Sequence, residues 1–298
     1  MLRFTRLGGG IKVKLTGQQS NMDSGKTIPI IGDASSVEQR TVSRWRWWLH
    51  LTILALFPLL AGVSGILNRD QAVTLLPDSV AGLLRVSVFE LIFFGVIFGI
   101  AWLASRVNFT QLRLSWRGGG KPLWLGFAYS FALRVAITLV LSAVVIGWML
   151  VTGLHSPGLD HVRPQTEQVV SAAALTQNPL YFALTLTLIS FVVAGFREEL
   201  WRAGMLAGLG ALFPGQFATW RGRAVAVVIV AVLFGLGHTA QGWAGVGVTG
   251  LLGVGLGIIM LWHRSIWEAV IAHGFFNAGT FAVLYCLAKY QPQQFQNL

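Results

Sequence analysis

Long apolar runs alternate with short polar or basic connections along the chain from about residue 44 onward. A helix of about 20 apolar residues is long enough to cross the hydrocarbon core of a bilayer. The pattern predicts spans at residues 48–67, 80–105, 122–152, 179–196, 224–240, 244–262 and 266–288. The predicted fold class is therefore an all-α, polytopic transmembrane helix bundle of about seven spans, with eight as the alternative count.

The segment 197–213 is the reason for the alternative. It keeps a helical pattern but carries two acids and two bases, so it can be one part of a broken span. Pro214 and Gly215 are expected to end it. The expected organisation is a disordered basic N-terminal tail (1–43), a transmembrane helical domain (44–290) and a short C-terminal tail (291–298).

Composition supports a membrane protein independently of the pattern. The 298 residues are 54% hydrophobic and 11% charged, whereas a soluble domain usually has about 25% charged residues. Twelve Trp and 35 Gly agree with interfacial aromatic belts and close helix contacts. These numbers exclude an ordinary soluble globular protein.

The formal net charge is +11, but the basic residues lie between apolar segments rather than along one face. We interpret them as cytoplasmic anchors, so no nucleic-acid partner is expected. The expected location is a bacterial inner membrane with a cytoplasmic N-terminus. The single cysteine, Cys286, excludes an intrachain disulfide framework and a cysteine-rich metal site.

Charged residues at membrane depth are costly and call for an explanation. Arg85, Glu90 and Arg134 lie inside predicted spans, where they can form intramembrane pairs or reach an interface. Packing and topology explain these three residues better than catalysis does.

The sequence Arg197-Glu198-Glu199-Leu200-Trp201-Arg202 lies at the edge of an apolar span. On a helix, Arg202 reaches both Glu198 and Glu199, because it follows them by four and three residues. Two carboxylates with a neighbouring arginine suit a general base that is held in place. The alternative is an interfacial charge cluster at a helix end.

Two further clusters contain histidine. His238 closes an apolar segment after Gly235 and Gly237, which allow close approach of another backbone or a substrate. His273 and Asn277 are four residues apart, so they share one helix face. This pair can stabilise a developing oxyanion, share a metal or orient a water. The alternative is an interhelical polar contact worth about 1 kcal/mol.

Together the three clusters resemble the motifs of the CPBP family of intramembrane proteases, which includes type II CAAX prenyl endopeptidases and Abi-like bacteriocin-processing or immunity proteins. The family pattern is Glu-Glu-x-x-x-Arg, then Phe-x-x-x-His, then His-x-x-x-Asn. Phe234 with His238 and His273 with Asn277 meet the last two motifs. The resemblance covers a protease-like core at about residues 179–288.

The first motif departs from the family pattern. The arginine is expected at position 203, which is Ala203, and Arg202 stands one residue earlier. A shift of one residue rotates a side chain by about 100° around the helix. Arg202 still lies one turn from Glu199, so we expect that ion pair to survive.

The resemblance implies an intramembrane endopeptidase, a hydrolase of the metalloprotease-like CAAX type. Glu198 would activate a water with help from His238, His273 and Asn277 would stabilise the oxyanion, and Glu199 and Arg202 would be a supporting pair. If a metal binds, zinc or another divalent ion would be held by Glu198, His238 and His273. No His-Glu-x-x-His motif is present. The implied partners are the lipid bilayer and a peptide or membrane-protein substrate, lipidated or not.

Two alternatives differ in class. One is a catalytically inactive family member that acts as a membrane scaffold or bacteriocin-immunity protein. The other is a transporter that uses the polar residues as an ion path, although no clear internal duplication is present.

An enzyme of this kind needs His238 and His273 at the same depth in the membrane, and straight helices would not place them there. His238 lies about 22 Å of helix beyond Arg223, and His273 about 14 Å beyond Arg264. A tilt, a later membrane entry or a helix break at Gly235 and Gly237 would reconcile these two depths.

Overall fold

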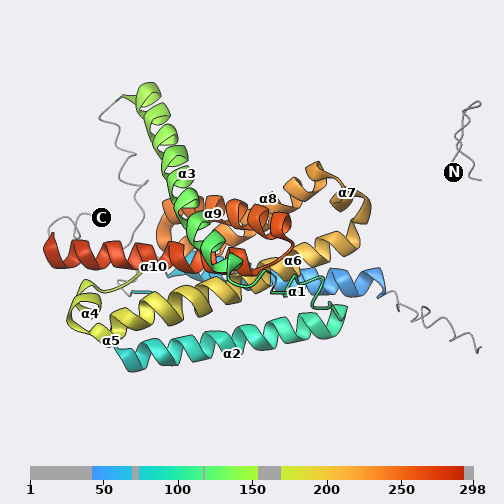
Figure 1. Ribbon diagram of the computed structural model, residues 1–298, viewed down its shortest axis with the longest axis horizontal. Coiled ribbons are helices and arrows are strands. Elements are labelled where there is room, and N and C mark those ends of the chain that lie inside the picture. Colours follow the sequence, from blue (N-terminus) through green and yellow to red (C-terminus); the bar gives the residue numbers. More distant parts are fainter. Residues whose placement is uncertain (1–41, 69–73, 117, 154–168, 292–298) are drawn as a thin grey trace, which may run out of the picture. The chain divides into compact units, whose positions relative to one another are not determined.

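The computed structural model describes residues 42–68, 74–116, 118–153 and 169–291. Nearly all of the predicted tails, 1–43 and 291–298, therefore lies outside the described residues. Within them every regular element is a helix (Figure 1). The elements are α1 (Arg44–Leu67), α2 (Val80–Ser105), α3 (Lys121–Thr152), α4 (Ala172–Gln177), α5 (Pro179–Leu184), the π-helix η3 (Thr185–Phe196), α6 (Arg197–Leu212), α7 (Pro214–Ala218), α8 (Trp220–Leu236), the 3-10 helix η4 (Thr239–Gln241), α9 (Gly242–His263) and α10 (Trp267–Tyr290).

The prediction of an all-α, polytopic membrane protein is confirmed. Six helical stretches of the described chain are long and apolar enough to cross a membrane: α1, α2, α3, the continuous stretch from α5 to α6, η4 with α9, and α10. The segment 197–213 is part of the fourth of these stretches rather than a separate crossing. The predicted fifth span corresponds to α8, which has 17 residues.

Helix α8 also differs from its predicted bounds of 224–240. It begins at Trp220, where the Thr219 side chain caps it by accepting a hydrogen bond from the Gly222 backbone N–H at 3.0 Å. It ends at Leu236, so the helix breaks between the two glycines of the sequence motif. His238 therefore lies in a turn and not on the helix.

Basic residues gather at one end of the bundle. Arg46 at the start of α1 donates to the Leu103 carbonyl near the end of α2 at 3.0 Å. The Ile266 N–H before α10 donates to the Arg113 carbonyl of the α2–α3 loop, also at 3.0 Å. The loops at these helix ends carry arginines. Such clustering of basic residues is expected on the cytoplasmic side of a membrane protein.

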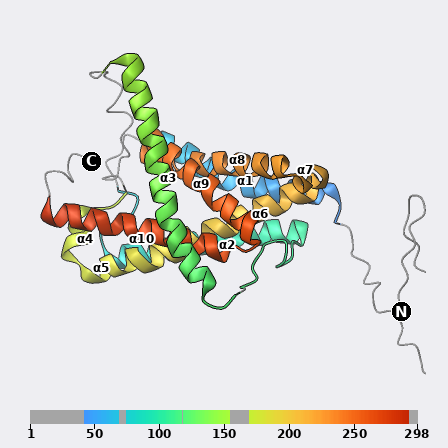
Figure 2. The same cartoon turned by 45° about the horizontal axis from the view of Figure 1, so that its top comes forward.

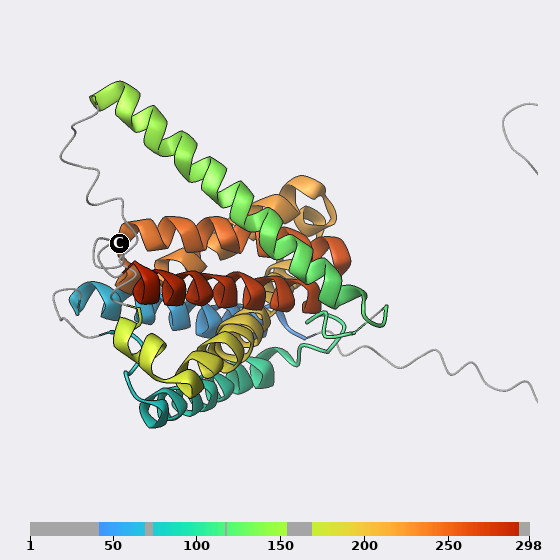
Figure 3. The same cartoon turned by 60° about the vertical axis from the view of Figure 1, so that its left-hand side comes forward.

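Helix α10 packs against η3, α3 and α9, and α1 packs against α2 and α6 (Figure 2). The buried residues of α3 lie between Pro122 and Ile137. Beyond them α3 leaves the bundle (Figure 3), so its second half presents an apolar surface to its surroundings.

The approach of η3 to α10 depends on two glycines. A Cβ atom on Gly274 would lie 2.2 Å from the Phe191 ring, and one on Gly195 would lie 3.0 Å from the Val270 carbonyl oxygen. Larger residues at these positions would separate the two helices. The glycines therefore bring the start of α6, which follows η3 directly, next to α10.

The π-helical form of η3 was not predicted. Its wide turns are visible in the hydrogen bond that the Ser190 hydroxyl donates to the Thr185 carbonyl, five residues earlier, at 2.7 Å. π-Helical turns are rare and frequently occur at functional sites. Here η3 ends at Phe196, immediately before the acidic cluster.

Candidate active site

Glu199 is the buried centre of the acidic cluster. Its side chain is 0% exposed and forms an ion pair with Arg202 one turn along α6, which is 1% exposed. The same carboxylate oxygen lies 2.9 Å from His273 Nδ1 on α10. Because an ionised carboxylate only accepts, the Nδ1–H donates to it. The ion pair expected between Glu199 and the shifted Arg202 is therefore confirmed.

Glu198 lies beside this pair and is less enclosed. Arg197 Nη2 donates to its Oε1 at 2.8 Å, while its Oε2 lies 3.7 Å from His273 Nε2. The second Arg197 nitrogen, Nη1, pairs with Glu90 on α2 at 2.5 Å. Arg197 thus ties one oxygen of Glu198 in place and leaves the other oxygen facing the imidazole.

His238 reaches the same region from the turn after α8. Its Nδ1 lies 2.8 Å from the Phe234 carbonyl oxygen, which can only accept, so Nδ1 carries a proton. In the neutral ring, Nε2 is then a free acceptor. Glu198, Arg197 and His273 are near enough to His238 to interact with it electrostatically.

The Phe234 ring lies between these groups. Its centroid is 4.7 Å from that of His238 and 6.1 Å from that of His273, and the Arg202 guanidinium carbon lies 4.5 Å from it. Both histidines therefore reach one depth in the bundle. The helix break at Gly235 and Gly237 accounts for this, because α8 stops before it would carry His238 further along its axis.

Asn277 is placed less directly. It lies one turn after His273 on α10 and is half-buried. Within the described part of the chain, its side chain takes part in none of the hydrogen bonds of the cluster. Its contribution to the site remains a prediction.

Several buried polar atoms of the cluster have no hydrogen-bond partner among the described residues: Glu199 Oε2, Arg197 Nε, and Arg202 Nε and Nη2. A buried polar group without a partner is costly, and ordered water or a ligand commonly satisfies it. The cluster thus offers hydrogen-bonding positions for water or for a polar backbone.

Metal binding by Glu198, His238 and His273 remains a prediction. In the parts of the chain that the structure describes, no three or more His, Cys, Asp or Glu side chains are arranged to hold a metal ion. One nitrogen of His273 is committed to Glu199 and one of His238 to a backbone carbonyl.

Sequence reasoning missed the role of Glu90 and Arg197. Glu90 was grouped with Arg85 and Arg134, but its partner is Arg197, 107 residues later in the sequence. Arg134 instead donates to the Phe276 carbonyl on α10 at 2.6 Å. One feature of the sequence could have indicated this pair. Glu90 is a carboxylate inside an apolar span with no basic residue one turn away, and such a carboxylate needs a partner on another helix.

The fold and this site together define a multi-pass membrane protein with carboxylates, arginines and histidines clustered inside a helical bundle. Residues 179–279 match the family model described as Rce1-like, type II CAAX prenyl endopeptidase. The match confirms the resemblance inferred from the motifs: this stretch, from α5 into α10, is similar to the type II CAAX prenyl endopeptidases. No curated protein and no solved structure matches the chain.

Proposed function

We propose that the protein is an intramembrane endopeptidase that hydrolyses a peptide bond with a water activated by Glu198 and His238. The N-terminus and the basic end of the bundle would face the cytoplasm of a bacterial inner membrane. The family match supports a protease of the CAAX type. The observation that carries the proposed chemistry is the arrangement of Glu198 between Arg197 and His273.

The 3.7 Å between Glu198 Oε2 and His273 Nε2 is too long for a direct hydrogen bond. A water that hydrogen-bonds to both atoms would lie to one side of the line that joins them. Glu198, held at its other oxygen by Arg197, would take a proton from this water. The water oxygen would attack the scissile carbonyl carbon, and the carbonyl π electrons would move to oxygen. His238 Nε2, with its Nδ1 bonded to Phe234, would help to orient the water.

His273 and Asn277 would donate hydrogen bonds to the resulting oxyanion. With Nδ1 donating to Glu199, Nε2 can donate only when the ring carries both protons. Glu198 would then return its proton to the leaving nitrogen as the C–N bond breaks, which gives a carboxylic acid and an amine.

The test compares site variants with matched controls outside the site. Loss of a general base typically lowers a rate by about 10²–10⁴-fold, and we expect Glu198→Gln and His238→Ala to lower kcat/KM by amounts in this range. The controls Glu268→Gln and His263→Ala also remove a carboxylate and an imidazole, but near the basic end of the bundle, where His263 bonds to Tyr129. Both controls should retain activity. Unchanged cleavage by both site variants would refute the assignment.

Substrate and metal dependence are tested with the same purified protein. A peptide ending in Cys-aliphatic-aliphatic-X would be supplied in farnesylated and unmodified forms, and cleavage of one form alone would define the substrate class. Zinc or another divalent ion at Glu198, His238 and His273 remains a prediction. A chelator that abolishes cleavage, with a stoichiometric metal found by mass spectrometry, would support that prediction.

A displaced arginine would favour the inactive-scaffold alternative. Arg202 nevertheless pairs with Glu199 in the cluster, so the displacement does not disrupt the supporting pair. Cleavage by the wild type would exclude this alternative. Solute flux into proteoliposomes without any cleavage would favour the transporter instead.

A further inference from the structure

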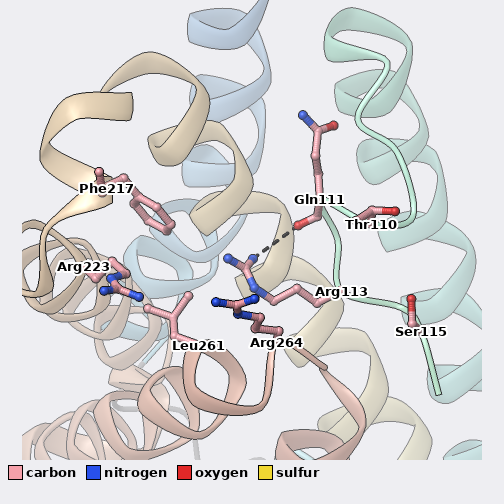
Figure 4. Close-up of a pocket in the computed structure, with 9 residues that line it drawn as sticks. Thr110, Gln111, Arg113, Ser115, Phe217, Arg223, Leu261 and Arg264 are labelled. Atoms are coloured by element: carbon pink, nitrogen blue, oxygen red, sulfur yellow. Dashed lines mark hydrogen bonds between the residues drawn. The ribbon is translucent and has the colours of Figure 1, made fainter. Parts of the chain in front are cut away.

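A second group of charged residues lies at the basic end of the bundle, apart from the carboxylate–histidine cluster. It lines a cavity of about 410 Å³ (Figure 4). Arg113 comes from the α2–α3 loop, Arg223 from the first turn of α8, and Arg264 from the turn between α9 and α10. Thr110 and Ser115 add hydroxyl groups, and Phe217 adds an apolar wall.

The three arginines have no acidic partner among the described residues. Arg113 Nη1 donates to the Gln111 carbonyl at 3.2 Å, which Figure 4 marks by a dashed line, and Arg223 Nε donates to the Thr219 carbonyl at 3.3 Å. The nearby carboxylate of Glu268 faces His263 instead, at 4.0 Å. Burial and the charge of Arg264 lower the pKa of Arg113. The cavity thus gathers positive charge without internal compensation.

The backbone that presents two of these arginines is unusual. Arg113 and Arg264 have φ angles of 55° and 53°, in the left-handed region that residues other than glycine seldom adopt. Such conformations persist when the surroundings enforce them, and they concentrate at ligand-binding sites. Here the Ile266 N–H bonds the Arg113 carbonyl at 3.0 Å, and Trp267 Nε1 donates to the Leu114 carbonyl at 2.9 Å. The loop is therefore fixed to the turn before α10, so the fold itself builds the cavity.

We propose that this cavity binds a phosphate group through Arg113, Arg223 and Arg264. Guanidinium groups match phosphate oxygens in geometry and charge, and the two hydroxyls can donate to the same anion. The volume exceeds what a bare phosphate needs and leaves room for an esterified group. Exposed tryptophans at the same end of the bundle (Trp116, Trp220 and Trp262) are typical of the headgroup level of a membrane. Basic pockets at this level bind anionic lipid headgroups.

The experiment uses the full-length protein in three arms. Inorganic phosphate is titrated against protein in neutral detergent. In the other arms, nanodiscs of phosphatidylcholine alone are compared with nanodiscs that also contain phosphatidylglycerol. Thermal stability is followed in each arm, and bound lipid is counted by native mass spectrometry. Stabilisation by inorganic phosphate identifies a free-phosphate site, and stabilisation by phosphatidylglycerol alone identifies a lipid headgroup site.

The variants are Arg223→Gln and Arg264→Gln, whose side chains are exposed and lie outside the packed core. Arg221→Gln is the matched control, because Arg221 lies two residues from Arg223, faces Trp220 and does not line the cavity. Loss of one charged hydrogen-bonding group should weaken binding about tenfold or more, with Arg223→Lys intermediate. Equal losses in Arg221→Gln, or no response to phosphate and phosphatidylglycerol, would overturn the proposal.

Discussion

The buried ion pair between Glu199 and Arg202 makes a quantitative prediction about stability. Glu199→Gln keeps the size of the side chain and an oxygen that can accept from His273, but removes the negative charge. Arg202, 1% exposed, would then remain as a buried charge without its carboxylate. Breaking a buried pair by removal of one partner costs about 3–5 kcal/mol, and we expect Glu199→Gln to lower the free energy of unfolding by about that amount.

Two further variants locate the origin of the loss. Glu90→Gln also removes a carboxylate from an arginine, but Arg197 keeps Glu198 as a second partner at 2.8 Å, so this change should cost less than Glu199→Gln. The double variant Glu199→Gln with Arg202→Met removes the unpaired charge and should recover most of the stability. A double-mutant cycle then gives the coupling between the two residues.

The assay is equilibrium unfolding in mixed micelles, followed by tryptophan fluorescence. Trp201, which is 3% exposed and donates to the Leu54 carbonyl at 2.8 Å, is an internal reporter beside the pair. A loss below about 1 kcal/mol in Glu199→Gln, equal to that of Glu90→Gln, would show that the native protein lacks this ion pair.

Two other predictions concern helix contacts. Gly274→Ala should destabilise the protein by about 1–3 kcal/mol and lower kcat, because its Cβ would meet the Phe191 ring at 2.2 Å and separate η3 from α10. Gly247→Ala, with nothing within 4 Å of the added Cβ, should change stability by less than about 0.5 kcal/mol, and equal effects of both would refute the packing argument. His50→Ala should cost about 2–5 kcal/mol, since His50 bonds to the Ala101 carbonyl at 2.9 Å and the Gly204 carbonyl at 3.0 Å. The folded fraction should keep its kcat/KM, and a selective loss of activity would place His50 in the chemistry.

Much of the fold follows from the sequence because lipid exposure imposes long apolar helices. The predicted span at 80–105 coincides with α2, and most other spans differ by a few residues at their ends. The difference at α8 has a local cause, since Thr219 caps the helix earlier than the basic pair Arg221 and Arg223 indicates. The π-helix η3 could not be predicted, because its apolar sequence fits an α-helix equally well and its form depends on contacts with α10.

The site was partly predictable for a similar reason. Glu199, Arg202 and His273 were identified as ionisable groups in apolar helices, and they meet in the bundle. The sequence did not predict that Glu199 is more deeply buried than Glu198, because their burial depends on how η3 positions the start of α6 against α10. The link from Glu90 to Arg197 joins different helices, so no local spacing indicates it.

The central claim is that Glu198 activates water to hydrolyse a peptide bond. Its most direct test is mass spectrometry of the products formed in ¹⁸O-labelled water by the wild type, Glu198→Gln and the control Glu268→Gln. We expect cleavage at one peptide bond, with a heavy oxygen in the new carboxyl group, for the wild type and the control, and almost no product for Glu198→Gln. Equal product from Glu198→Gln, or no cleavage by the wild type, would contradict it.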